Sequence, residues 1–542
     1  MNSNTRGTML VTAVILGAAL LGGIYGPSVR ATAGGTDELR DAVRQFTRVL
    51  AIVEENYADP VKADELVYQG AIPGMLRVLD PHSNFFDARQ FTLIREDQRG
   101  KYYGVGMQVA PREGRTIVLA PFVGSPAYNA GIRPGDVILK VDDTPTDGLS
   151  TAEVADLLKG PKGTVVRVTV GREGELEPLE FTVTRDEIPR PGVDHVFQIA
   201  PGIGYIRVNG FNETTDQQLQ QALRKLDAEN LKGLILDLRN NPGGLLNEGV
   251  AVADMFLEKN QLIVSHRGRS SPERRYFAMR GHRGLEVPLV VLVNSVSASA
   301  SEIVAGAIQD HDRGLIVGET TFGKGLVQNL FNLSENTGLA MTTAKWYTPS
   351  GRLIQRDYKS VSIYDYLYNR KKTVNNGNTD VRLTDSGRQV FGGGGITPDV
   401  LVPTPKPNEF QSLLYRRDVF FPLEVGVGGF TRYYLGLKPT PKVTRTFQVT
   451  ESVLSEFRHY LQQKNIPYTE ADLQANRAWI EQKIKKELFL SVFGMDEAFR
   501  LELDHDPQVA KAIEVLPEAR ALYERAKQVM AQRQAAEAGN RP

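Results

Sequence analysis

Residues 290–328 place the strongest constraint on how this chain can fold. They begin with an apolar β-branched run, residues 290–293, which has the length and composition of a strand covered on both faces. Small residues follow at 295–301, and apolar residues then recur at helical spacing up to Gln309. A strand that passes through small residues into a helix presents a serine beside the free N–H groups of the helix, where negative charge is stabilised. The stretch therefore predicts a serine nucleophile in an α/β core.

A lysine follows the next strand-like run of the same stretch. Residues 315–317 are β-like, and Lys324 lies between two glycines with Phe322 and Leu326 close by. A serine hydroxyl needs a base, and the chain has no cysteine to act in its place. Lysine is a base only when neutral, and lowering its pKa from about 10.4 to about 7 corresponds to roughly 4 to 5 kcal/mol, which burial can supply. We therefore expect a desolvated Lys324.

These two segments together resemble a known peptidase signature. SASASEI at 297–303 and GETTFGKGLVQ at 318–328 look like the active site of the carboxyl-terminal processing peptidases, the tail-specific serine proteases of family S41 that use a Ser-Lys dyad. The resemblance implies that Ser299 is the nucleophile, that Lys324 is the general base and that Gln328 orients the lysine. Ser297 and Ser301 fit the motif less well.

Two structural readings of the same residues stay open. Small residues at a helix start can serve close packing alone, and a Gly-Lys-Gly can be a β-turn. A phosphate-binding loop is a third reading of Gly-Lys-Gly, but its GxxxxGK[ST] pattern is not met because Gly325 follows the lysine.

An earlier strand also runs into a glycine-rich segment. Residues 233–238 are strand-like and continue into RNNPGG at 239–244, where glycines free backbone N–H groups to point at a ligand. The family resemblance implies an oxyanion hole built from the N–H groups of Gly244 and Ala300. Gly243 in place of Gly244, or a tight strand-to-helix turn without catalytic function, are the alternatives.

The region from about Gln98 consists of short strands and turns. It contains SPAYNAGIRPGDVI, and Ser150 with Glu153 forms a capping box before an apolar helix. The region is similar to a PDZ domain, whose carboxylate-binding loop would be Tyr103, Gly104, Val105 and Gly106. Successive glycine N–H groups can converge on a terminal carboxylate while the peptide extends the sheet. The alternative is a loop that serves folding alone.

Composition excludes several kinds of function. The 64 basic and 64 acidic residues balance, so the whole molecule has no field that attracts nucleic acid. The absence of cysteine excludes disulfides and thiol sites, and the seven histidines show no metal-ligand spacing. His311 follows the helix predicted up to Gln309, where histidine favourably caps carbonyl groups. We expect neither a metal nor a cofactor.

The N-terminal residues predict export. Arg6 precedes an apolar run at residues 9–25, and Ala31-Thr-Ala33 provides a small-residue cleavage site. The run is intermediate in length between a cleaved signal and a spanning helix, so residues 1–33 are either a signal peptide or a membrane anchor. Both place the rest of the chain outside the cytoplasm, in a periplasm or on the outer face of the cytoplasmic membrane.

Two parts of the chain depart from the family pattern. A long insertion at about 356–391 has the length of a lid, a partner site or a disordered loop. The segment 405–542 is mainly helical, with candidates at 452–463, 470–493 and 517–537. Such amphipathic helices either cover the core or mediate self-association, and we favour self-association.

Together these observations predict a multidomain α/β protein with a crotonase-like (ββα) peptidase core, an inserted PDZ-like β domain, N-terminal helices and a helical C-terminal extension. The expected divisions are a signal or anchor at 1–33, a helical region at 36–96, a PDZ-like domain at 97–188, the peptidase core at 189–404 and the extension at 405–542.

The predicted function is an exported serine endopeptidase that captures unstructured C-terminal tails of proteins and cuts near them. Because PDZ-like domains of this family can block or align the site, an activator or adaptor protein is an expected partner, and a homo-oligomer is expected too. The rival functions are a non-catalytic PDZ scaffold that binds C-termini and an acyl-CoA-type crotonase enzyme. Fold alone does not decide between them.

Overall fold

The computed structural model describes residues 36–112, 114–172, 174–368, 380–420, 429–437, 439 and 441–539. The predicted signal or anchor at 1–33 lies outside these residues. Within them, we find no helix with the length and apolar character that a bilayer crossing needs. The chain divides into two compact units, one ending at Val78 and the other beginning at Leu79.

The first unit is helical, as its amphipathic pattern predicts. The apolar positions Leu39, Val43 and Phe46 recur along one long helix and remain exposed. The second helical segment of this unit contains a π-helical turn in its middle. The elements are α2 (Thr36–Asn56), α3 (Ala63–Glu65), the π-helical η1 (Leu66–Ala71) and α4 (Ile72–Leu79), which ends at the start of the second unit.

The second unit contains an antiparallel sheet of PDZ type. Its strands lie in the order β3-β4-β5-β7-β8, with β6 paired to β5, so β3 is an edge strand. The capping box predicted at Ser150 and Glu153 is confirmed at the start of α7. The elements are β3 (Met107–Arg112), β4 (Arg115–Pro121), α6 (Pro126–Ala130), β5 (Val137–Val141), β6 (Thr144–Pro145), α7 (Thr151–Leu158), β7 (Val165–Gly171) and β8 (Leu179–Thr184).

A two-stranded ribbon and a helix flank this sheet. The strand β2 (Lys101–Gly104) pairs antiparallel with β9 (Asp186–Pro189), so the chain enters and leaves the PDZ-like region through neighbouring strands. The helix α5 (Ala88–Arg99) precedes β2, is capped by the Asp87 side chain and ends at Gly100 in the left-handed conformation. The ribbon therefore joins the sheet to the residues of the core.

The core is a six-stranded sheet that continues from this ribbon. The order is β10-β11-β12-β15-β16-β21; β10 is antiparallel to β11, and each later pair is parallel. Every residue of β12 and β15 is buried, as expected of strands covered on both faces. The strands are β10 (Val193–Ala200), β11 (Ile203–Val208), β12 (Gly233–Asp237), β15 (Leu289–Val293), β16 (Leu315–Gly318) and β21 (Val400–Leu401).

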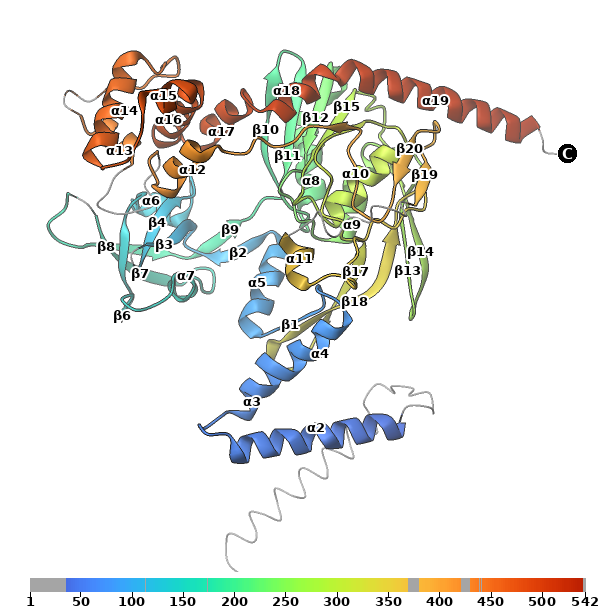
Figure 1. Ribbon diagram of the computed structural model, residues 1–542, viewed down its shortest axis with the longest axis horizontal. Coiled ribbons are helices and arrows are strands. Elements are labelled where there is room, and N and C mark those ends of the chain that lie inside the picture. The colour runs from blue at the N-terminus through green and yellow to red at the C-terminus, as the bar shows by residue number, and fades with distance from the viewer. Residues whose placement is uncertain are drawn as a thin grey trace, which may run out of the picture. The chain divides into compact units, whose positions relative to one another are not determined.

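Helices cover both faces of this sheet (Figure 1). One face packs against α8 (Thr215–Lys225), α9 (Leu246–Asp254) and α10 (Ala300–Asp310), with the short η2 (Ala228–Asn230) after α8. The other face packs against side chains of the C-terminal extension, among them Leu503, Val509, Val515 and Leu516. Leu503 ends α17 (Met495–Leu503), Val509 lies in α18 (Pro507–Glu514), Val515 follows that helix and Leu516 begins α19 (Leu516–Gly539). Part of the extension therefore covers the core, whereas self-association stays a prediction.

The remaining C-terminal helices form a core of their own around Phe430, Phe457 and Ile484. The single helix predicted at 470–493 is wrong, because the chain breaks at Asn476. The Asn476 side-chain oxygen accepts hydrogen bonds from Asn408 at 2.7 Å and Gln411 at 3.0 Å, which hold it out of a continuous helix. The elements are α12 (Glu409–Arg416), α13 (Phe430–Leu435), α14 (Glu451–Gln463), α15 (Glu470–Ala475) and α16 (Arg477–Phe493).

A second sheet completes the peptidase region. Its order is β1-β18-β13-β14, with β17 also paired to β18. The loop that carries Lys324 leads directly into β17. The elements are β1 (Asn84–Phe86), β13 (Leu262–Gly268), β14 (Ser271–Phe277), β17 (Leu326–Asn332), η3 (Ser334–Asn336) and β18 (Gly338–Tyr347). The described part of the insertion holds α11 (Ile363–Tyr368), β19 (Val381–Leu383) and β20 (Gln389–Phe391).

Candidate active site

Ser299 lies at the predicted turn between β15 and α10. It is the residue that caps α10, and its backbone adopts φ 54° and ψ −113°. A non-glycine residue in such a sparsely populated conformation carries on the order of 1 to 3 kcal/mol of strain, which the surrounding structure must hold. The side chain is half-buried and lines a cavity of about 1360 Å³. The turn therefore presents one hydroxyl to the cavity.

The two neighbouring serines of the motif are used differently. Ser297 and Ser301 are fully buried. The Ser297 hydroxyl donates to the carbonyl of Leu238 at 2.8 Å, and that of Ser301 donates to the carbonyl of Asn241 at 2.9 Å. The two hydroxyls thus hold Leu238 and the RNNPGG segment that follows it near the start of α10, and Ser299 alone of the three lines the cavity.

Lys324 lines the same cavity as Ser299. Its main chain is held on both sides, since its N–H donates to Glu302 at 2.9 Å and its carbonyl accepts from the Trp346 indole at 3.1 Å. Burial lowers the pKa of the Lys324 amine, and the charges of Glu302 and Asp80 oppose that shift. No described residue accepts a hydrogen bond from this amine. The environment thus shifts the lysine in the direction of the neutral amine that a base requires.

Glu302 connects the serine segment to the lysine segment. Its carboxylate is fully buried in the first turn of α10 and accepts from the N–H of Ser299 at 2.8 Å. It also accepts from the N–H of Gly323 at 2.6 Å, from the N–H of Lys324 and from the hydroxyl of Thr321. Burial raises the pKa of Glu302, while these donors stabilise the ionised form. One carboxylate thereby sets the spacing between two segments that are distant in the chain.

The RNNPGG segment lies against Ser299. A Cβ atom built on Gly243 would come within 2.8 Å of the Ser299 Cβ and 3.0 Å of the Ala300 nitrogen. The Gly243 N–H already donates to the Asn241 side chain at 2.9 Å. By contrast, no described residue accepts a hydrogen bond from the N–H of Gly244 or of Ala300. Of the two glycines between which the sequence does not decide, Gly244 is the one whose N–H has no acceptor among the described residues.

Gln328 lines the cavity, but the hydrogen bond of its side-chain nitrogen goes to the main-chain carbonyl of His82. His82 was not among the residues expected at the site. Burial, followed by the charge of Lys324, lowers its pKa to about 4, so its ring is neutral at neutral pH. In the sequence, His82 belongs to an Asp-Pro-His-Ser segment that follows the last residue of α4.

The residues expected to bind a carboxylate lie where β2 leads into β3. Tyr103 and Gly104 belong to β2, and Gly104 pairs with Asp186 of β9. The carbonyl of Val105 accepts from the Ala127 N–H at 2.8 Å, and that of Gly106 accepts from the Ser125 hydroxyl at 2.6 Å. These bonds fix the carbonyl groups of the loop. The loop leads into the edge strand β3, and α7 lies beside that strand.

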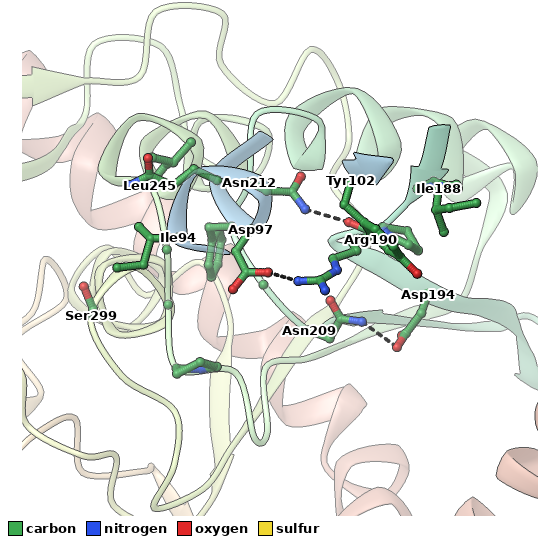
Figure 2. A pocket seen from close by; sticks show the side chains of 18 of the residues that line it. Ile94, Asp97, Tyr102, Ile188, Arg190, Asp194, Asn209, Asn212, Leu245 and Ser299 are labelled. Carbon is green, nitrogen blue, oxygen red and sulfur yellow. Dashed lines mark hydrogen bonds and ion pairs between the residues drawn. The ribbon is translucent and has the colours of Figure 1, made fainter. Parts of the chain in front are cut away.

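The cavity reaches from Ser299 to the PDZ-like region. Figure 2 shows Ser299 on one side of it and Tyr102 and Ile188, from the β2-β9 ribbon, on the opposite side. Arg190 forms an ion pair with Asp97 across this space. One cavity therefore extends from the β2-β9 ribbon to Ser299. The described residues contain no cluster of three or more His, Asp or Glu side chains suited to a metal ion.

Comparison with known proteins agrees with this architecture. The family model of Peptidase family S41 matches residues 202–361, a PDZ domain model matches 117–172, and the model "Probable PDZ-protease, C-terminal helical domain" matches 467–516. The class that the fold and these matches define is a peptidase with a PDZ domain.

Similar proteins narrow that class. The carboxy-terminal-processing protease of Bartonella bacilliformis is 36% identical over 408 residues, which cover 74% of this chain and 83% of that protein. The carboxyl-terminal-processing protease of Synechocystis sp. is 39% identical over 305 residues, 55% of this chain and 71% of that one. A solved photosystem II D1 C-terminal processing protease is 31% identical over 66% of this chain and 92% of its own, with a TM-score of 0.36. The chain belongs to the carboxyl-terminal processing proteases of family S41, and the predicted resemblance is confirmed.

Proposed function

We propose that this protein is an exported serine endopeptidase that hydrolyses peptide bonds near the C-termini of protein substrates with a Ser299-Lys324 dyad. The observation that carries the proposal is that both side chains line one cavity while Glu302 binds the main chain at both residues. A scaffold that only binds tails gains nothing from a buried lysine whose charged form is disfavoured.

In the proposed reaction, neutral Lys324 takes the proton of the Ser299 hydroxyl as the serine oxygen attacks the scissile carbonyl carbon. The N–H groups of Gly244 and Ala300 stabilise the resulting oxyanion, and each is expected to contribute about 3 to 4 kcal/mol. The lysine ammonium then gives its proton to the leaving amine as the C–N bond breaks. Water, deprotonated by Lys324, hydrolyses the acyl-enzyme and restores the serine. Gln328 is assigned the role of orienting the lysine.

Substrate capture is assigned to the PDZ-like region. The loop of Tyr103, Gly104, Val105 and Gly106 would bind the terminal carboxylate of an unstructured tail, and the tail would add a strand at β3. The edge position of β3 supports this assignment. The shared cavity supports delivery of the same tail to Ser299.

Several further parts of the prediction belong to this proposal. They are export by the segment 1–33, extracytoplasmic location, the stated domain divisions, the crotonase-like description of the core, a homo-oligomer and an activator or adaptor protein. The parallel strands with α8, α9 and α10 on one face support the description of the core.

The test compares wild type with Ser299→Ala and Lys324→Ala on casein and on a fluorogenic peptide that ends in a free, apolar C-terminus. Both variants should bind the peptide as wild type does but cleave it at no more than about a thousandth of the wild-type rate. Equal cleavage by all three proteins would contradict the dyad. Binding without cleavage by the wild type would instead favour a PDZ scaffold.

A further inference from the structure

The insertion at 356–391 places one side chain beside the segment that carries Lys324. In its helix α11, Tyr366 is fully buried. Ile363, Tyr364 and Tyr368 of the same helix are 54%, 67% and 74% exposed. A helix of six residues has little stability of its own, so Tyr366 is what anchors it to the protein.

The ring of Tyr366 packs against His82 and against Phe322, which lies two residues before Lys324. It meets Phe322 at 5.7 Å between ring centroids and His82 at 5.6 Å, both edge to face. The Arg356 guanidinium lies 4.6 Å from the centre of the same ring and donates to the Tyr366 carbonyl at 2.7 Å. At Tyr366 the insertion is therefore packed against the segment that carries Lys324.

The hydroxyl of Tyr366 lies within hydrogen-bond distance of two side chains. The Gln355 side-chain nitrogen lies 3.2 Å from it, and His82 Nε2 lies 2.8 Å from it. An amide nitrogen can only donate, so the tyrosine oxygen accepts from Gln355, and its own proton can go to Nε2 when His82 carries its proton on Nδ1. Burial raises the pKa of Tyr366 and lowers that of His82, so both partners are neutral at neutral pH.

The main chain of His82 carries the contact onward. Its carbonyl accepts a hydrogen bond from Gln328, which lines the cavity with Lys324. We propose that Tyr366 is a positioning residue for the catalytic lysine: its hydroxyl holds His82, and the His82 carbonyl holds Gln328 at the cavity beside Lys324. The inference rests on the proposed Ser299-Lys324 chemistry and assigns to the insertion a role in that chemistry.

The first test uses Tyr366→Phe in the full-length protein, because this change removes only the hydroxyl. A small displacement of Gln328 and Lys324 should lower kcat about tenfold, given that a misplacement of about 1 Å can cost a hundredfold. The KM for the fluorogenic tail peptide should stay within about twofold, because the PDZ-like loop is untouched. The matched control is Tyr364→Phe, which removes an exposed hydroxyl from the same helix and should leave both constants unchanged.

The second test is a double-mutant cycle with Gln328→Ala. If Tyr366 acts through Gln328, adding Tyr366→Phe to Gln328→Ala should lower kcat no further. Multiplying effects of the two changes would overturn the proposal, as would a Tyr366→Phe enzyme with wild-type kcat. A fall in activity that matches a loss of folded protein, measured by circular dichroism, would also overturn it. If Ser299→Ala cleaves as well as wild type, the proposed function fails and this inference fails with it.

Discussion

Replacement of Glu302 by glutamine should separate two effects of its carboxylate. One is the set of hydrogen bonds that it accepts, and the other is the influence of its charge on the pKa of Lys324. An amide keeps one acceptor oxygen, which can face the N–H groups of Ser299 and Lys324. Its NH₂ group then faces the Thr321 hydroxyl, which can reorient, and the N–H of Gly323, which cannot. One buried N–H without an acceptor costs about 1 to 3 kcal/mol, and the two remaining bonds lose their charge assistance.

Relief from burying an ionised group offsets part of this cost. We therefore expect a loss of about 2 to 3 kcal/mol in the free energy of unfolding, which corresponds to a fall of roughly 5 to 10 °C in the Tm of the peptidase region. The activity should fall as well, because the spacing between Ser299 and Lys324 depends on the lost bonds. Differential scanning calorimetry and steady-state cleavage of the tail peptide measure the two quantities.

The pH dependence of kcat/KM reports the second effect, the influence of the Glu302 charge on the pKa of Lys324. The charge of Glu302 raises the pKa of Lys324, whereas burial lowers it below 10.5. Removing the charge should lower this pKa further, so the acidic limb of kcat/KM should move to lower pH even as its plateau falls. Glu248→Gln is the matched control, because Glu248 also lies in the first turn of a helix but accepts a hydrogen bond from only one main-chain N–H. A limb that moves to higher pH, or a stable and fully active Glu302→Gln, would refute the reasoning.

Three further outcomes are expected. Burial lowers the pKa of His82 from 6.5 to about 4, so between these pH values the unfolded chain binds a proton that the folded protein does not. The free energy of unfolding should therefore fall by about 3 kcal/mol as the pH is lowered from 6.5 to about 4. Acid unfolding of His82→Gln should lack this contribution. Gly106→Ala should weaken tail-peptide binding at least tenfold, measured by calorimetry, because its Cβ would meet the Ser125 side chain at 2.5 Å. Gly114→Ala, where φ is similarly positive but the space is open, should not weaken binding. Gly243→Ala should lower kcat at least a hundredfold in the peptide assay, whereas Gly284→Ala, strained but unobstructed, should leave it unchanged.

Local patterns were enough to predict the strand and helix on either side of Ser299. The apolar run and the helical spacing correspond to β15 and α10, since burial on both faces and helical periodicity are properties of neighbouring residues. The PDZ-like strands and the capping box at Ser150 were predictable for the same reason. The pairing of Ser299 with Lys324 as site residues came from the motif and its spacing.

Contacts between distant segments could not be predicted in this way. In the sequence, Glu302 is an acidic residue in a first helical turn, which usually faces solvent. Its partner Gly323 lies 21 residues away, and no periodicity links the two. His82 and Tyr366 are 284 residues apart and meet only because the insertion folds back on the core. The C-terminal helices were recognisable as amphipathic. The pattern did not predict that Val509 and Leu516 pack against the six-stranded sheet.

The cover of the second sheet face has a consequence for biosynthesis. The strands of the core are complete at Leu401, whereas the residues that shield their second face begin at Phe499. A nascent chain must therefore carry an open apolar surface while the intervening helices are made. The second face of this sheet is therefore covered only once α17, α18 and the start of α19 have been made.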